Sequence, residues 1–330
     1  MRRLTDLTEV IDKFKNDWNY FLKHELKMQN LEIIVMEDLN FNASAGFRSN
    51  HEGEFLIKIN EGVFHQIWNF YHRTFNDKNL SIVKMAGFID ENTSCDKDFP
   101  VSLANLYVNI TINFIFLHEL GHIVNNHILY LKNLNYNNDL MMIYPKSKKL
   151  EDLNISAYEY QMLEVEADEF ATKNIFRIVT NEYLVKGLLN LPSFYTVAPT
   201  IKHLCLYIFS SIINERSLQG LGANRTKYDL TKARYIPNRM RLLVILQELT
   251  KNMNLFLKND SYPEKMMLEH IERFESIINL YLIEECFYDE SVLSTQNNLD
   301  ELDEDVFNHI NYLKKFIYPN LKKKLKDLSI

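Results

Sequence analysis

The chain contains few of the residues that make tight turns. Its 330 residues include 8 glycines and 7 prolines, well below average usage, which excludes collagen-like and low-complexity proteins. An all-β fold would need many more turn residues than these. Hydrophobic residues make up 46% and charged residues 25% of the chain, which is ordinary for a globular protein. We therefore predict a mainly α-helical globular fold.

Cysteine, positive charge and long apolar runs are also scarce. The 3 cysteines are widely spaced, so we expect free thiols in a reducing compartment and no disulfide framework. The net charge of −7 gives no basic field that would attract nucleic acid. The longest apolar run, residues 204–213, is far too short to span a membrane, and acidic residues interrupt the N-terminal stretch, unlike a secretory signal. We expect a soluble, cytoplasmic protein with no nucleic-acid partner and no membrane partner.

Hydrophobic periodicity divides the chain into a small β part and a larger helical part. Residues 7–26 have helical spacing, while the segments 31–36 and 54–59 predict two strands separated by a polar loop at 37–53. Further helices are predicted at 61–75, 101–131, 156–181, 200–214, 237–257 and 263–285. The expected fold class is mainly α, of the α+β type.

The C-terminal tail changes from acidic to basic along its length. Acidic residues cluster at 300–305 and lysines at 322–326, an order that complements the dipole of a single helix. We interpret the tail as a solvent-exposed terminal helix, in preference to a basic binding arm.

Residues 118–122 read His-Glu-Leu-Gly-His inside the helix predicted at 101–131. His118 and His122, four positions apart, lie about 40° apart around a helix and about 6 Å along it, so both imidazoles can bind one metal ion. The carboxylate of Glu119, rotated by about 100°, can take a proton from an activated water molecule and return it to a leaving amine. The neighbouring residues are apolar, and buried ionisable groups are costly unless they pair or coordinate a metal. The pattern predicts a catalytic metal site.

A catalytic zinc site usually has three protein ligands and one open position, so one more ligand must come from elsewhere. A metzincin motif would require Gly and His where this chain has Asn125 and Ile128, and that class is excluded. A downstream acidic helix offers Glu164 as a ligand, with Asp168 on the same face to orient a histidine ring. Glu166 competes as a ligand, but it points about 160° away if Glu164 faces the site. The alternative is an acidic helix whose carboxylates are all solvated.

These two segments resemble the gluzincin metallopeptidases. In that group the two histidines and a downstream glutamate bind zinc, and the glutamate inside the motif is the general base. The resemblance implies Zn²⁺ as cofactor, His118, His122 and Glu164 as its ligands, and Glu119 as the base. The run over 164–171 is similar to two soluble bacterial branches, the Lit-type phage-exclusion peptidases and the ImmA/IrrE regulatory peptidases.

Chain length, the strands near the N-terminus and the long helical C-terminal part favour the Lit-like branch. That likeness implies a zinc endopeptidase that cleaves a cytosolic protein, with a role in phage exclusion through cleavage of a translation elongation factor. It also implies one zincin-like domain over 1–290, with the sheet and active-site helix at 31–131 and the third ligand at 155–290, followed by a C-terminal helix at 291–330. The alternatives are an ImmA/IrrE-like protease that cleaves a repressor, and a non-catalytic sensor or interaction protein in which the metal only braces two helices.

A peptidase site also needs a group that stabilises the oxyanion of the reaction. Residues 235–241 resemble the His-Pro…Arg element that HtpX-like peptidases place over the site, although no histidine precedes Pro237. The resemblance makes Tyr235 and Arg241 candidate catalytic residues. The alternative is an ordinary helix that starts at Pro237. We interpret His127 as a core histidine whose hydrogen bonds are satisfied.

Overall fold

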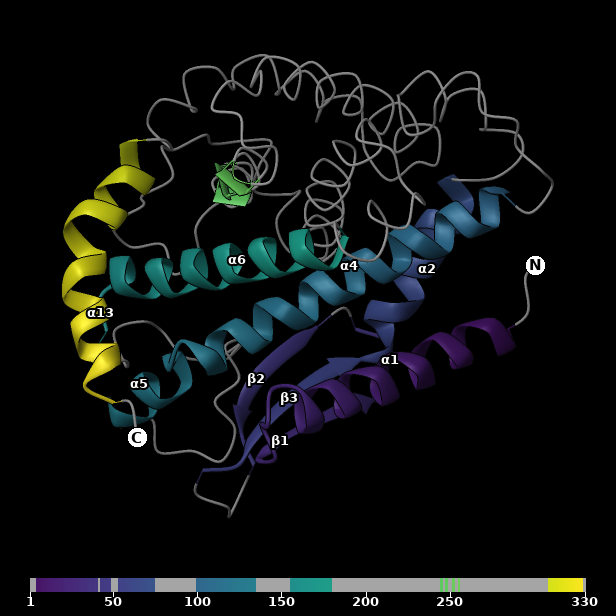
Figure 1. Ribbon diagram of the computed structural model, residues 1–330, viewed down its shortest axis with the longest axis horizontal. Coiled ribbons are helices and arrows are strands. Elements are labelled where there is room, and N and C mark those ends of the chain that lie inside the picture. Colours follow the sequence, from purple (N-terminus) through teal and green to yellow (C-terminus); the bar gives the residue numbers. More distant parts are fainter. Residues whose placement is uncertain are drawn as a thin grey trace, which may run out of the picture.

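The computed structural model describes most of the N-terminal half and the C-terminal end of the chain. The described residues are 4–40, 42–48, 53–74, 99–134, 155–179, 244–245, 247–248, 251–252, 255 and 308–328. Their elements are α1 (Leu4–His24), β1 (Leu31–Met36), β2 (Ala43–Phe47), β3 (Phe55–Asn60), α2 (Glu61–Thr74), α4 (Phe99–Val124), α5 (His127–Asn133), α6 (Ala157–Val179), the π-helical turn η5 (Leu313–Ile317) and α13 (Tyr318–Lys326). The predicted α+β fold, mainly helical with a small sheet near the N-terminus, is confirmed (Figure 1). The helices predicted at 200–214 and 263–285, and the three cysteines, lie outside the described residues.

The sheet has three strands in the order β1-β3-β2. The central strand β3 pairs parallel with β1 and antiparallel with β2. The prediction of a loop over 37–53 was wrong at Ala43–Phe47, which is strand β2. Its Ala-Ser-Ala-Gly-Phe sequence has low intrinsic strand preference, and this segment becomes a strand because its backbone pairs with the edge of β3.

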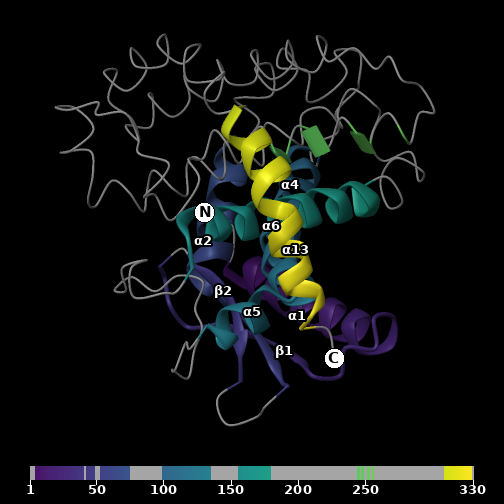
Figure 2. The ribbon, with the colours of Figure 1, turned by 90° about the vertical axis from the view of Figure 1, so that its left-hand side faces the viewer.

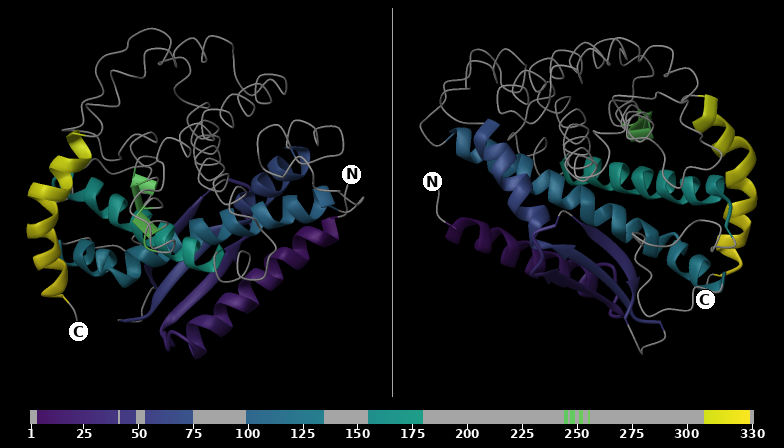
Figure 3. Two further views of the ribbon diagram at one scale, coloured as in Figure 1. Left: turned by 45° about the horizontal axis from the view of Figure 1, so that its top comes forward. Right: turned by 180° about the vertical axis from the view of Figure 1, so that it is seen from behind.

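An aromatic core joins α1, α2 and α4. The ring of Trp18 lies 4.3 Å from that of Phe116, and its indole N–H donates to Oδ1 of Asn113 over 2.6 Å. Phe14 packs edge-on against Phe64 and Phe116. These contacts fasten α1 to α2 and α4. The helix α4, which carries the His-Glu-Leu-Gly-His motif, lies between the sheet and α6 (Figures 1 and 3). Although α4 has 26 residues and is mostly apolar, no helix of the described part of the chain has the length and apolar character needed to cross a membrane.

The helix predicted at 101–131 is interrupted in the structure. α4 ends at Val124, and α5 begins at His127 after a turn in which Asn126 adopts a left-handed conformation with φ 63°. Asparagine tolerates this conformation better than most residues, because its short polar side chain can hydrogen-bond locally. Because of this break, the side chains that follow Val124, including that of His127, point in other directions than they would in one continuous helix.

The C-terminal segment, residues 308–328, packs across α5 and the N-terminal half of α6 (Figure 2). Its buried apolar residues join the core: Ile310, Leu313, Leu321 and Leu325. Two of its lysines pair with carboxylates of α6, Lys314 with Glu169 and Lys324 with Glu159, each over 2.6 Å. The interpretation of this segment as a terminal helix with exposed lysines is confirmed over residues 308–326, but it missed the apolar face, which is buried.

Candidate metal centre

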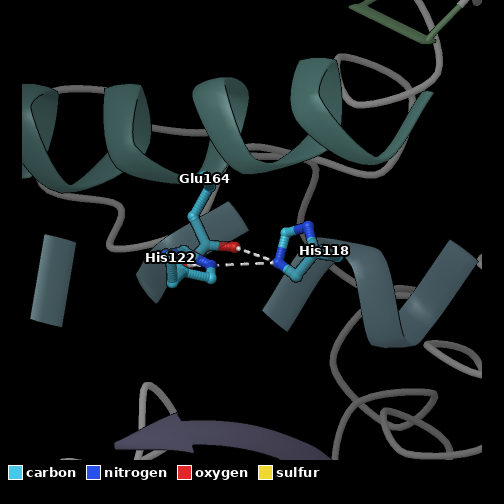
Figure 4. A group of neighbouring side chains, drawn as sticks. All are labelled: His118, His122 and Glu164. Carbon is cyan, nitrogen blue, oxygen red and sulfur yellow. Dashed lines mark hydrogen bonds and ion pairs between the residues drawn. The ribbon is translucent and has the colours of Figure 1, made fainter. Parts of the chain in front are cut away.

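Three side chains from α4 and α6 converge on one point (Figure 4). The Nε2 atoms of His118 and His122 lie 3.1 Å apart. Glu164 projects from α6 toward both rings, with Oε2 at 3.5 Å from His118 Nε2 and Oε1 at 3.9 Å from His122 Nε2. Ligand atoms around a tetrahedral zinc ion at about 2.1 Å are about 3.4 Å from one another. One ligand atom from each of the three residues lies within 4.8 Å of the other two, so the three side chains can reach a single small cation.

The burial of these donors also fits a metal ion. The side chains of His122 and Glu164 are almost fully enclosed, at 1% and 3% exposure. Oε1 of Glu164 is buried and has no hydrogen-bond partner among the described residues. A buried carboxylate oxygen without a donor is costly, and a cation between the carboxylate and the imidazoles would offset that cost. His118, His122 and Glu164 could therefore bind a metal ion, and two nitrogens with one carboxylate form a donor set that suits zinc.

The motif glycine allows α6 to approach α4 at this point. A Cβ atom on Gly121 would lie 3.3 Å from the Cα of Ala167 and 3.2 Å from the ring of Phe170, tighter than ordinary van der Waals contact. Glu164 precedes Ala167 by about one helical turn, so the close approach of the two helices brings its carboxylate to the histidines. The small residues at 121 and 167 thus set the distance between the two helices, and with it the distance of Glu164 from the histidines.

The ring nitrogens on the far side of the cluster have partners too. Nδ1 of His118 lies 2.9 Å from Oδ1 of Asp168, which is fully buried. Nδ1 of His122 lies 3.0 Å from Nδ1 of His127, and Nε2 of His127 lies 3.0 Å from Oε2 of Glu166. Glu166 thus contacts His127, whereas Glu164 is the acidic residue within the donor cluster. Sequence reasoning missed the contact between His122 and His127, because in an unbroken helix these residues would point about 140° apart.

Of the three predicted catalytic residues, the structure describes one. Glu119 lies on α4 between the two histidines and is buried, at 6% exposure. Tyr235 and Arg241 lie outside the described residues.

One comparison with known proteins finds a similarity, to a protein family. The sequence model of the family Peptidase U49 matches residues 85–211, a stretch that includes both histidines, Glu164 and Asp168. The match covers less than half of the chain, and it indicates a peptidase. No curated protein and no solved structure matches the chain. The chain is thus similar to a peptidase family over the segment that holds the metal-binding cluster.

Proposed function

We propose that this protein is a zinc metallopeptidase of the gluzincin type, with His118, His122 and Glu164 as the zinc ligands. The observation that supports it best is the convergence of these three buried donors inside the segment that is similar to Peptidase U49. Zinc bound there would supply a Lewis acid that activates water for attack on a peptide carbonyl at neutral pH.

The other residues of the proposed mechanism act on protons and on orientation. Glu119, between the two histidines on α4, would accept a proton from the attacking water and return it to the departing amine. Asp168 accepts a hydrogen bond from Nδ1 of His118 and so keeps the Nε2 of that ring available to the metal.

The number of ligands favours hydrolysis over a purely structural metal. A structural zinc site usually has four protein ligands, whereas a catalytic one keeps a position open. The described residues supply three. His127 contacts the far nitrogen of His122 and is not part of the donor cluster. The proposal therefore favours an enzyme over a metal-braced sensor.

The decisive experiment compares the wild-type protein with Glu119→Gln. The amide keeps the size of the side chain but cannot accept the proton, so the variant should bind one zinc ion per chain and lose cleavage by about 10²–10⁴-fold. Both proteins are incubated with a cell extract, and new peptide termini are identified by mass spectrometry. Fragments that appear with wild type and not with Glu119→Gln establish the activity.

Glu54→Gln serves as the matched control. Glu54 directly precedes β3, and its exposed carboxylate pairs with Arg48. This variant should cleave as the wild type does. Full cleavage by Glu119→Gln, or a wild-type protein that binds no zinc, would refute the proposed function.

For the substrate, we propose a cytosolic protein, and more narrowly a translation elongation factor cleaved during phage exclusion. This proposal is supported by the Lit-like resemblance of the motif segments alone. Purified elongation factors tested beside whole extract would decide it: a single cut in an elongation factor supports it, and cuts confined to other proteins contradict it.

We also propose that Tyr235 and Arg241 stabilise the oxyanion of the reaction. Tyr235→Phe and Arg241→Ala should then lower kcat while the zinc content stays at one ion per chain. Unchanged kcat in both variants would remove these residues from the mechanism.

A further inference from the structure

A line of contacts runs from the metal-binding cluster to the C-terminal segment. Nδ1 of His122 meets Nδ1 of His127 at 3.0 Å, and Nε2 of His127 meets Oε2 of Glu166 at 3.0 Å. The hydroxyl of Tyr318, the first residue of α13, donates to Oε1 of the same carboxylate over 2.9 Å. Side-chain contacts thus link four residues from four elements, each to the next. Tyr318 and Glu166 are 152 positions apart in the chain.

With Glu166 as a carboxylate and His127 as a neutral ring, the donor and acceptor roles of these groups set the direction of each hydrogen bond. An ionised Glu166 only accepts, so the ring of His127 must donate from Nε2. Nδ1 of a neutral His127 is then an acceptor, and it must receive its hydrogen bond from Nδ1–H of His122. His122 in this tautomer carries no proton on Nε2, the nitrogen that faces His118 and Glu164. The line of contacts therefore selects the form of His122 that can bind a metal.

The pKa of Tyr318 and the burial of His127 favour the same directions for these hydrogen bonds. Burial raises the pKa of the Tyr318 hydroxyl, and the neighbouring carboxylates of Glu166 and Glu169 raise it further. Tyr318 therefore keeps its proton and acts as a donor. His127 is fully buried, so water does not compete for its ring nitrogens.

The fold makes this arrangement through the break between α4 and α5. In a continuous helix His127 would point away from His122. The left-handed turn at Asn126 starts a new helix at His127 and brings its ring back against His122. The side-chain amide of Asn126 also donates to the carbonyl of Leu325 in α13 over 3.4 Å, so the turn itself contacts the C-terminal segment.

We propose that His127, Glu166 and Tyr318 form a positioning relay that holds His122 with its metal-facing nitrogen unprotonated and couples the C-terminal segment to metal affinity. The inference rests on the metal site of the proposed function. It adds residues outside the ligand set, and it gives the last helix a role in the site.

The first test measures zinc affinity by competition with a chromophoric chelator. His127→Leu removes the acceptor of His122 and should weaken zinc binding by about 10–100-fold. His127→Asn should recover much of the affinity, because its amide oxygen can take the place of Nδ1. Tyr318→Phe should give a smaller loss in the same direction, since Glu166 still accepts from His127.

Two matched control variants test whether zinc affinity depends on the relay itself or only on the attachment of the C-terminal segment to α6. Tyr312→Phe removes a hydroxyl from the same segment, at a ring that packs against Tyr158 and Phe316. Glu169→Leu breaks the ion pair with Lys314 that also joins the segment to α6, whereas Glu166→Leu breaks the relay. The relay predicts weaker zinc binding for Glu166→Leu than for Glu169→Leu. Equal losses in the two variants would show that only attachment matters.

The second test reads the tautomer of His122 directly in zinc-free protein. Nitrogen-15 spectra of the histidine rings, with His122 assigned by its loss in His122→Gln, should show a proton on Nδ1 in the wild type. In His127→Leu and Glu166→Leu the proton should move in part to Nε2. An unchanged tautomer together with unchanged zinc affinity would overturn the relay. A wild-type protein that binds no zinc would refute the proposed function, while the tautomer measurement would still decide on the relay.

Discussion

Gly121 of α4 and Ala167 of α6 face each other where the two helices come closest to the metal-binding cluster. A Cβ on Gly121 would be 3.3 Å from the Cα of Ala167, and that atom belongs to the backbone and cannot rotate away. The separation of the helices at the motif is therefore set by the absence of a side chain at position 121. Glu164 reaches the histidines only because of this separation.

Gly121→Ala should weaken zinc binding without unfolding the protein. The added methyl group pushes α6 away by a few tenths of an ångström and withdraws Glu164 from the histidines. Alanine is a better helix former than glycine by about 1 kcal/mol, which offsets part of the packing cost. Thermal unfolding of the zinc-free variant should stay close to wild type while zinc affinity falls. Val124→Ala, at an exposed position of α4, should change neither quantity, and unaltered zinc affinity in Gly121→Ala would contradict this account of the spacing.

Asp168 should tolerate asparagine but not alanine. Asp168 lies 2.9 Å from Nδ1 of His118, and an asparagine amide oxygen can accept the same hydrogen bond. In Asp168→Ala the buried N–H of His118 has lost this acceptor, which costs about 1–3 kcal/mol and should lower zinc affinity by about 10–100-fold. Zinc competition on the two variants tests the difference. Equal losses in both would mean that charge, not orientation, is what Asp168 contributes.

The sequence was sufficient to predict the elements with strong local signals. The β-branched run at 31–36 forms β1, and α6 begins next to Ser156, where a Ser-x-x-Glu capping box is present: the backbone N–H of Glu159 donates to Oγ of Ser156, and the backbone N–H of Ser156 donates to the Glu159 carboxylate. The spacing of the histidines and the face shared by Glu164 and Asp168 follow from helix geometry, and the structure brings these side chains together.

The features that sequence reasoning missed depend on tertiary contacts. Strand β2 has weak local preference and forms against β3. The end of α4 depends on the single backbone conformation of Asn126, which periodicity does not reveal. The packing of the C-terminal segment did have a sequence signal, since Ile310, Leu313, Leu321 and Leu325 recur at helical spacing. The order of its charges, considered alone, predicts a solvent-exposed helix instead. The contact between Glu166 and Tyr318 joins positions 152 residues apart, and no local pattern predicts it.

The ion pair between Glu159 and Lys324 should make attachment of α13 sensitive to acid. Burial raises the pKa of Glu159, but hydrogen bonds from Lys324 and from Ser156 outweigh it and hold the pKa below its ordinary 4.5. The pair therefore contributes fully above pH 4.5, and its contribution disappears as the pH falls through the lower pKa of the folded state. Glu159→Gln keeps a side chain suited to the capping box and loses the charge. Its stability should fall below wild type by about 1 kcal/mol or less at pH 6, and the gap should close as the pH falls below 4.5. A gap that is constant in thermal unfolding from pH 6 to pH 3.5 would exclude this origin.

Glu164→Gln should change the stability of the protein in opposite directions with and without zinc. The carboxylate of Glu164 is 3% exposed, and burying it without a cation is unfavourable, so the neutral amide should make the zinc-free protein as stable as wild type or more so. With zinc at about 1,000 times the dissociation constant, binding should stabilise wild type by about 4 kcal/mol, and the variant should gain much less because its third ligand is uncharged and weaker. Thermal unfolding of both proteins, with a chelator and with excess zinc, gives the four values needed. A chelator that leaves the wild-type midpoint unchanged, or a variant that gains as much from zinc as wild type does, would show that Glu164 is not a ligand.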